Sequence, residues 1–307
     1  MAAESDIIFL KRFVLLQVFR DRTVNPMTQT QFRRATLLVL LCLAVMAPGK
    51  RVAVQERETP QRYEIKRIPF APGEVFEYAV TWNGIPAADG SAWVERSVQG
   101  AKECYDFKLI TKTNSVLDIL WKMRDSGQST VDAKTLLPKQ HLFVHQENDR
   151  RRRYTSTFDH ERKLVECVRE VVEKNRTDRV RFSCEFAFDP ISAPYFLRCL
   201  DWRAGDLRQL EMVENNARYL FTVQAVGVEE ITVPAGKFRA VKLRPVLTRL
   251  GGVKKKPVAA KEAEVWVSDD DYHIPLRLKT ASFVGHIYVD LANFQLASGG
   301  RPPSLCP

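Results

Sequence analysis

The sequence lacks most of the short patterns that identify enzymes and metal proteins. No cysteine stands in a CxxC or CxxH spacing, so a zinc site is not supported, and the sequence predicts neither a metal nor a cofactor. No serine occupies a GxSxG nucleophile elbow. No βαβ unit recurs along the chain, which disfavours a nucleotide-binding α/β fold. The sequence therefore assigns no catalytic residue, and a protein without catalysis is favoured over an enzyme.

Long apolar runs are also scarce, and the clearest one follows two positive charges. Arg33 and Arg34 precede about a dozen apolar residues, 35–47, and Pro48 and Gly49 come after them. This order of charge, apolar core and small residues is typical of an export signal. Met27 opens a normal short polar start for such a signal, so it is the expected translation start. The pattern predicts a periplasmic protein, or one anchored in the inner membrane by an uncleaved signal.

The chain carries a formal net charge of +10, and part of it is clustered. Arg150, Arg151, Arg152 and Arg153 form one cluster, and Lys254, Lys255 and Lys256 form another, both in turn-like contexts. These residues are either solvated loop tips or a docking surface for anionic lipid or polysaccharide. Neither cluster contains the interleaved aromatic residues of a single-strand nucleic-acid groove, so nucleic acid is not an expected partner.

Short strands with turns between them dominate the rest of the chain. We divide it into a leader at 1–49, a flexible lead-in at 50–68, a single antiparallel β domain at 69–297 and a tail at 298–307. Asn83-Gly84, Asp89-Gly90 and Gln99-Gly100 are turn signals. Short helices are expected at 115–122 and at 190–200, the second with Asp189 as its N-cap. Strands are predicted at 75–82, 92–98, 104–111, 129–132, 141–146, 154–158, 164–172, 179–186, 219–228, 230–233, 238–246, 263–268, 276–282 and 285–293.

Five cysteines lie beyond the leader, in a chain expected to reach an oxidising compartment. Cys167 and Cys184 are the favoured disulfide, because a hairpin centred between Asn175 and Arg176 would place them directly opposite each other. Cys104 with Cys199 is a weaker second pairing. Buried free thiols remain the alternative.

Two segments offer candidate chemistry. Asp269, Asp270, Asp271 and His273 could bind a cation or act in hydrolysis, but neighbouring residues of an extended chain point to opposite sides. A β-turn in which the Asp side chains bond local N–H groups is the ordinary interpretation. His141 and His145 would share one strand face, which makes a metal pair conceivable but weakly supported.

Several stretches resemble a bacterial exported family known as domain of unknown function 3108. The resemblance implies an antiparallel β protein of the cell envelope, and it brings no established activity and no catalytic residue. The matching pieces are FAPGEVFEYAVTWNGIPAADGSAWVE at 70–95, STVDAKTLLPKQ at 129–140, FDPISAPYFLR at 188–198, VPAGKFRAVKLRP at 233–245 and VWVSDDDYHIPLRLKTASFVGHIYVDL at 265–291.

We therefore expect a mainly β fold, a large twisted antiparallel sheet forming a half-barrel or open barrel with one or two short helices. Its concave side would bind an apolar or amphiphilic ligand, such as a lipid, or an envelope partner, without catalysis. The alternatives are a structural or assembly factor that docks on anionic lipid or polymer, and a hydrolase using the Asp269–Asp271 loop with His273. Membrane association is expected to be peripheral or through an uncleaved leader. The candidate groove residues are Trp121, Phe143, Tyr195, Phe196 and Trp202.

Overall fold

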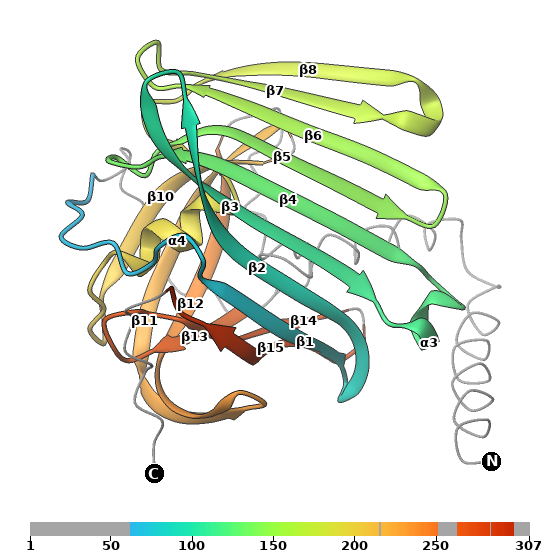
Figure 1. The fold of residues 1–307 in the computed structure, drawn as a ribbon, viewed down its shortest axis with the longest axis vertical. Coiled ribbons are helices and arrows are strands. Elements are labelled where there is room, and N and C mark those ends of the chain that lie inside the picture. Colours follow the sequence, from blue (N-terminus) through green and yellow to red (C-terminus); the bar gives the residue numbers. More distant parts are fainter. Residues whose placement is uncertain (1–61, 215, 251–262, 283, 298–307) are drawn as a thin grey trace.

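The computed structural model describes residues 62–214, 216–250, 263–282 and 284–297. One 15-stranded sheet, ordered β8-β7-β6-β5-β4-β3-β2-β1-β15-β14-β13-β12-β11-β10-β9, dominates them. Strand β1 pairs with both β2 and β15, so the first and last strands are neighbours at the middle of the sheet. Two meanders extend from this centre, one towards β8 and the other towards β9 (Figure 1).

The first meander contains the strands whose inner face carries most of the polar residues discussed below. Its strands are β1 (Val75–Trp82), β2 (Ile85–Gln99), β3 (Lys102–Thr113), β4 (Met123–Asp132), β5 (Pro138–Glu147), β6 (Arg150–Asp159), β7 (Leu164–Val171) and β8 (Arg176–Ser183). The second meander consists of β9 (Ala187–Phe188), β10 (Leu207–Glu214), β11 (Ala217–Val233), β12 (Gly236–Leu250), β13 (Ala263–Ser268), β14 (Pro275–Ala281) and β15 (His286–Gln295). Each consecutive pair in the sheet is antiparallel except β9 with β10, which is parallel.

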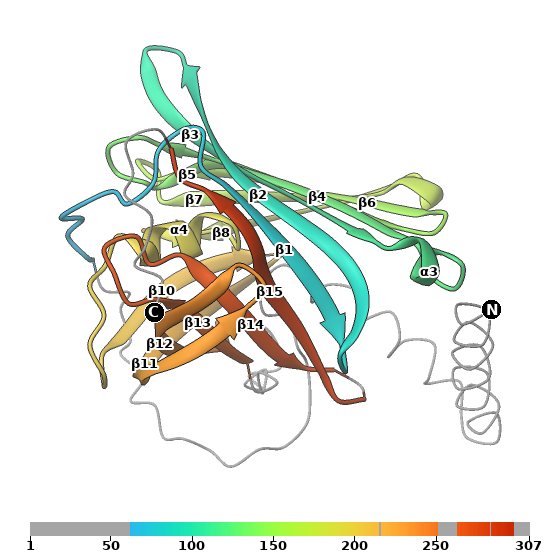
Figure 2. The same ribbon diagram turned by 60° about the horizontal axis from the view of Figure 1, so that its bottom comes forward.

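The described residues also form three short helical segments, α3 (Ser115–Asp118), the 3-10 helix η3 (Val172–Lys174) and α4 (Ser192–Arg198). Helix α4 lies on the concave side of the sheet (Figures 1 and 2). Six of its seven residues are buried, and Tyr195 stacks on Phe107 of β3 with ring centroids 3.9 Å apart. Burial of such large side chains stabilises the fold by roughly 1.5–3 kcal/mol each.

The sheet bends far enough for its two arms to approach each other. Val213 of β10 packs in one cluster with Phe158, Val165 and Cys167 of β6 and β7. The two sheet edges, β8 and β9, do not pair with each other, so the sheet stays open. This curled, unclosed sheet with α4 on its concave side confirms the expected fold class (Figure 2).

Most predicted strands are present, and three differences have local causes. Asp89 and Gly90 lie inside β2 rather than in a turn, paired with residues of both β1 and β3. The two short strands predicted at 219–233 form the single strand β11, with a register shift between Ala225 and Gly227. Strand β10 was not expected at all, since its side chains from Gln209 to Glu214 are all buried and show no alternation.

Candidate functional site

The N-terminus of α4 is fixed by a buried aspartate. Asp189 is fully buried, and its Oδ1 accepts hydrogen bonds from the backbone N–H groups of Ile191 and Ser192. Its Oδ2 accepts from Ser192 Oγ (2.8 Å) and from Ser129 Oγ of β4 (2.6 Å). Asp189 therefore accepts backbone hydrogen bonds at the start of α4 and ties the helix to the sheet, but the N-cap position itself is Ile191, two residues later than the sequence predicted.

Ser129, Asp189 and His141 are the residue types of a hydrolase triad, and they lie near one another. Ser129 and His141 are directly opposite each other in the β4–β5 ladder. Ser129 Oγ donates to the carboxylate of Asp189 rather than to an imidazole, which is not the order that activates a serine. All three side chains are buried, and burial lowers the pKa of His141. This arrangement supports packing of α4 and not nucleophilic attack.

The C-terminus of α4 is fixed by a buried ion pair. Arg198 donates to both carboxylate oxygens of Glu74 at 2.6 and 2.9 Å, and the two side chains are 3% and 1% exposed. The guanidinium also lies over the rings of Phe76 and Tyr195, and its Nε donates to the carbonyl of Tyr272. Three of the stretches quoted for the family resemblance, at 70–95, 188–198 and 265–291, thus meet around α4.

The acidic loop between β13 and β14 is a turn whose carboxylates face different partners. Asp270 Oδ1 accepts from Ser268 Oγ and from the backbone N–H of Tyr272, which is the local pattern expected of a turn. Asp269 pairs with Arg239 at 2.5 Å, and Asp271 pairs with Arg67. The three carboxylates therefore do not converge on one point.

His273 is buried at the end of this loop. Its Nδ1 donates to the carbonyl oxygen of Arg198 at 3.0 Å, and burial lowers its pKa. The imidazole therefore serves as a neutral donor that joins the loop to the end of α4.

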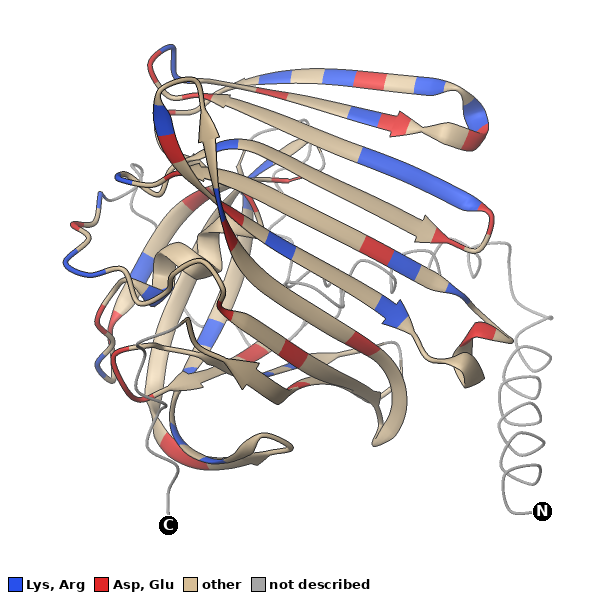
Figure 3. Cartoon of the chain, viewed as in Figure 1, with Lys and Arg blue, Asp and Glu red and all other residues tan. Residues whose placement is uncertain are grey.

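The arginine cluster forms part of a strand, not a loop tip. Arg150 to Arg153 are the first four residues of β6, so alternate side chains point to opposite faces of the sheet. Arg152 lies opposite His145 in the ladder, on the face that carries α4, whereas Arg151 and Arg153 point to the other face. The four arginines are therefore divided between the two faces of the sheet, at the start of β6 (Figure 3 marks their place along the strand). The other predicted cluster, Lys254–Lys256, lies outside the described residues.

A charged cluster lies on the concave face between α4 and the end of the sheet where β6 begins. His145 Nδ1 donates to Asp125 at 2.8 Å, and its Nε2 is 3.8 Å from Glu147, which also accepts from Trp121 Nε1. Burial opposes a charge on His145, but the bonds to Asp125 and Glu147 outweigh it and raise its pKa to about 9. The imidazole is therefore protonated at neutral pH, and it is a poor general base there.

Two arginines beside this cluster have a buried donor without an acceptor. Arg152 Nε and Arg169 Nε are buried and have no hydrogen-bond partner among the described residues. Arg169 is opposite Tyr154 in the β6–β7 ladder, and Arg152 is opposite Val171, so the two side chains are diagonal neighbours on the same face. Buried donors without acceptors are rare in proteins and indicate a missing partner.

The aromatic groove residues named from the sequence divide into two groups. Tyr195, Phe196 and Trp202 are buried in the main core with α4. Phe143 packs against the edge of that core, and Trp121 is half-buried against a second cluster formed by Val80, Ala88, Met123 and Val289. Only Phe143 and Trp121 therefore lie beside the charged cluster.

The predicted Cys167–Cys184 disulfide is not formed. Helix η3, closed by Asn175 with φ of +45°, centres the β7–β8 hairpin between Glu173 and Lys174, two residues earlier than the sequence suggested. Cys167 therefore pairs with Val180, and Cys184 falls beyond the end of β8. The free cysteines of the described residues, all buried, are Cys104, Cys167, Cys184 and Cys199.

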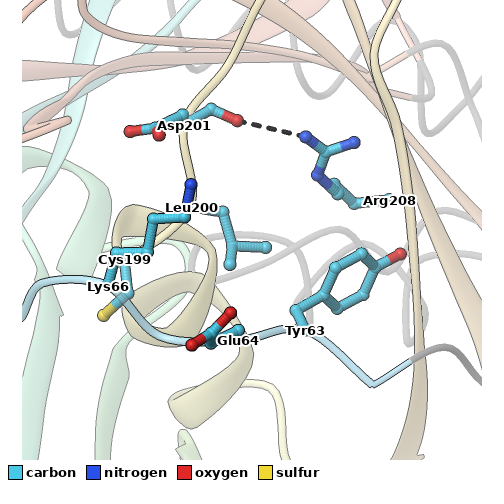
Figure 4. A pocket seen from close by; sticks show the side chains of 7 residues that line it. All are labelled: Tyr63, Glu64, Lys66, Cys199, Leu200, Asp201 and Arg208. Atoms are coloured by element: carbon cyan, nitrogen blue, oxygen red, sulfur yellow. Dashed lines mark hydrogen bonds between the residues drawn. The ribbon is translucent and has the colours of Figure 1, made fainter.

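A shallow cavity of about 320 Å³ lies on the other side of α4, where the lead-in crosses the end of the helix (Figure 4). Tyr63 contributes its hydroxyl as acceptor for Gln209 N–H, and Arg208 donates to the carbonyl of Asp201. Burial raises the pKa of Cys199, which also lines this cavity, to about 12, so its thiol is not a nucleophile at neutral pH.

The sequence did not identify Asp125, Glu147, Arg169, Glu74 or Arg198 as site residues. No local pattern marks these residues, and the groups that they face lie at other places in the chain; Glu74 and Arg198 are 124 positions apart. The one available signal was polar residues at positions where β4 and β5 should point inward.

Within the described residues, no helix combines the length and the apolar character needed to cross a bilayer. No curated protein matches this chain as a relative.

Solved structures similar to this chain include three bacterial proteins. One is a beta-barrel-like protein of domain of unknown function DUF1849 from Brucella abortus, with 11% identity, a TM-score of 0.45, and coverage of 73% of this chain and 98% of that one. A candidate lipoprotein from Parabacteroides distasonis has 11% identity and a TM-score of 0.32, with 74% and 98% covered. A candidate exported protein with a YmcC-like fold from Bacteroides fragilis has 13% identity and a TM-score of 0.28, with 74% and 98% covered.

The family model gives a firmer result, and it confirms the resemblance seen in the sequence. The model matches residues 77–292, which run from β1 into β15 and make up more than half of the chain. The chain therefore belongs to the family described as protein of unknown function (DUF3108).

Proposed function

We propose that this chain is an exported protein of the cell envelope that holds an anionic amphiphile on the concave face of β4–β7, without catalysis. The observation that carries the proposal is the pair of buried Nε donors of Arg152 and Arg169, which have no acceptor among the described residues. The acceptors that best satisfy the N–H donors of a guanidinium are carboxylates and phosphates.

The neighbouring charges do not already supply that acceptor. Asp178 lies opposite Arg169 in the β7–β8 ladder, but it bonds Arg176 at 2.9 Å. Asp125 and Glu147 face His145, which is directly opposite Arg152. An acidic headgroup would therefore supply the acceptor that the Nε groups of Arg152 and Arg169 lack.

Aromatic surface beside the arginines suits the apolar part of such a ligand. Phe143 and Trp121 are half-buried, and the Tyr154 ring lies 5.9 Å from the Arg169 guanidinium carbon. A ligand site of this kind combines apolar walls with a few placed polar groups.

The compartment is supported by the sequence alone. Arg33 and Arg34 followed by the apolar run 35–47 have the order of an export signal, in residues outside those described. Fractionation should place the chain in the periplasm, with inner-membrane retention as the alternative. Recovery in the cytosol would contradict this part of the proposal.

Ligand binding can be tested by titrating the purified chain with a fluorescent fatty acid, a carboxylate amphiphile. Arg152→Gln and Arg169→Gln should each weaken binding by about tenfold, since a charge-assisted hydrogen bond is lost in a partly buried place. Native mass spectrometry of the purified protein should also show a bound lipid-sized molecule.

Arg153→Gln is the matched control, because Arg153 is the next residue on the same strand and points to the opposite face. It should bind as tightly as the unsubstituted chain. Equal loss in Arg153→Gln and Arg152→Gln, or no binding by the unsubstituted chain, would contradict the proposed site.

A further inference from the structure

Three turns meet at one end of the sheet and form a continuous surface. We call this surface the rim and define it as residues 114–122 around α3, residues 148–151 between β5 and β6, and residues 172–176 around η3. Both views place α3 and the β5–β6 and β7–β8 turns at the same end of the molecule (Figures 1 and 2).

Hydrogen bonds join the three parts of the rim. Asn148 N–H donates to the carbonyl of Lys122 at 2.8 Å, and Lys122 N–H donates to Asn148 Oδ1 at 2.9 Å. The backbone N–H of Arg151 donates to Glu173 Oε2 of η3 at 3.3 Å. These bonds fix the spacing between the parts of the surface.

Apolar side chains project from the rim into solvent. Ile119 is 60% exposed, Val116 44% and Leu120 41%, all around α3, and Val172 of η3 is 57% exposed. Helix α3 is capped by Asn114, whose Oδ1 accepts from Leu117 N–H, so these side chains stand on an ordered turn. An exposed apolar group of this size at one end of a protein indicates an interaction surface.

Basic residues surround these apolar side chains. The exposed basic residues of the rim and its margin are Lys122, Arg150, Arg151, Arg153, Lys174 and Arg176. The carboxylates among them are Asp118, Asp149, Glu170, Glu173 and Asp178. Of these, Asp118 pairs with Arg124, Glu170 with Arg153 at 3.8 Å and Asp178 with Arg176 at 2.9 Å. The remaining balance is four basic side chains against two acidic ones, so the rim is positive (Figure 3).

We propose that the rim docks on the surface of an anionic phospholipid bilayer, with Val116, Ile119, Leu120 and Val172 at the boundary between headgroups and acyl chains. Separate apolar side chains ringed by Lys and Arg are the composition of interfacial anchors. The positive charge complements anionic headgroups, which argues against a second, equally positive copy of the same rim. This inference concerns the end of the sheet and stands apart from the ligand site on its concave face.

Hydrogen–deuterium exchange tests the rim directly, because it reads each segment of the full chain separately. Vesicles of phosphatidylcholine with 30% phosphatidylglycerol should slow exchange in residues 114–122 and 172–176. Stable docking should lower the exchange rate by about tenfold or more. Vesicles of phosphatidylcholine alone should leave exchange in these segments unchanged.

Two variants separate the apolar and the charged contributions. Ile119→Ser/Leu120→Ser and Arg151→Ser/Lys174→Ser should each weaken vesicle binding of the rim by about tenfold, with thermal unfolding unchanged because these side chains are exposed. The matched controls stand at the opposite end of the strands: Val98→Ser, which is 66% exposed, and Lys102→Ser/Arg162→Ser. The controls should bind as the unsubstituted chain does.

Three results would overturn the inference. They are protection that avoids the rim, protection of the rim without vesicles as the protein concentration rises, and equal losses in rim variants and controls. The second result would indicate a second copy of the chain as the occupant. Arg152→Gln removes the proposed ligand site and leaves the rim intact, so failure of one proposal does not carry the other with it.

Discussion

The buried ion pair that holds α4 gives the sharpest test of the architecture. Glu74→Leu would leave the Arg198 guanidinium 3% exposed, facing the rings of Phe76 and Tyr195, with only the carbonyl of Tyr272 as acceptor. Breaking a buried pair from one side costs about 3–5 kcal/mol of unfolding free energy, because an unpaired charge stays in the core. Burying a charge without its partner is the main part of that cost.

Removing both charges should be far less damaging. Glu74→Leu/Arg198→Met removes the unpaired charge and keeps apolar volume, so its main cost is that the carbonyl of Tyr272 loses its donor, about 1–2 kcal/mol. The sum of the two single-variant losses of unfolding free energy should therefore exceed the loss in the double variant by a coupling energy of at least about 2 kcal/mol.

Urea unfolding followed by tryptophan fluorescence measures these differences in unfolding free energy. The variants are compared by the shift of the urea midpoint, with the denaturant slope m unchanged. Glu185→Leu is the exposed control, because the Lys163–Glu185 pair is 57% and 55% exposed. It should change stability by less than about 0.5 kcal/mol. The reasoning fails if Glu74→Leu costs less than about 1 kcal/mol, or if the two single effects simply add.

Three further predictions concern the concave face and the thiols. Because the pKa of His145 is raised from 6.5 to about 9, its protonation stabilises the fold fully below pH 6.5, and this is lost as pH rises through about 9. Between pH 6.5 and 9 the unsubstituted chain should lose up to about 3 kcal/mol of unfolding free energy, measured by urea denaturation, and His145→Asn should not show this loss. Parallel curves of unfolding free energy against pH for the two proteins would contradict the prediction. Gly127→Ala should cost about 1–3 kcal/mol in thermal unfolding, since its Cβ would stand 2.7 Å from Ile191 Cδ1, whereas Gly227→Ala, with open space, should be near neutral. Unfolding without reductant should expose the thiols of Cys104, Cys167, Cys184 and Cys199 to alkylation by iodoacetamide. A disulfide-linked peptide in the mass spectrum would contradict the free thiols of the structure.

Local patterns in the sequence were sufficient for most of the sheet. Strand-forming residues bounded by turn signals predicted β1 and β13 with their bounds as they are in the structure. Strand β10 escaped this reasoning, since Gln209, Glu211 and Glu214 are buried together with the apolar residues between them. Burial raises the pKa of Glu214 to about 8, as expected for a carboxyl that only tertiary packing could bring inside.

The disulfide prediction failed for a geometric reason. Sequence spacing gives the hairpin midpoint that would place Cys167 opposite Cys184. It does not give the turn that the chain adopts between β7 and β8. Helix η3 ends at Lys174, and the left-handed conformation of its C-cap, Asn175, closes the hairpin two positions early. A shift of this kind moves each strand residue to a different partner, so Cys167 is opposite Val180.

The sequence by itself determined most of the strands, the aspartate at the start of α4 and the membership of the chain in its family, because each depends on residues close together or on an ordered series of motifs. Only the tertiary structure decided which charges meet. Curling of the sheet brings Glu74 to Arg198, and pairing of β4, β5 and β6 places Asp125, His145 and Arg152 in one row. Contacts between residues far apart in the chain depend on register and curvature, which the local sequence does not encode.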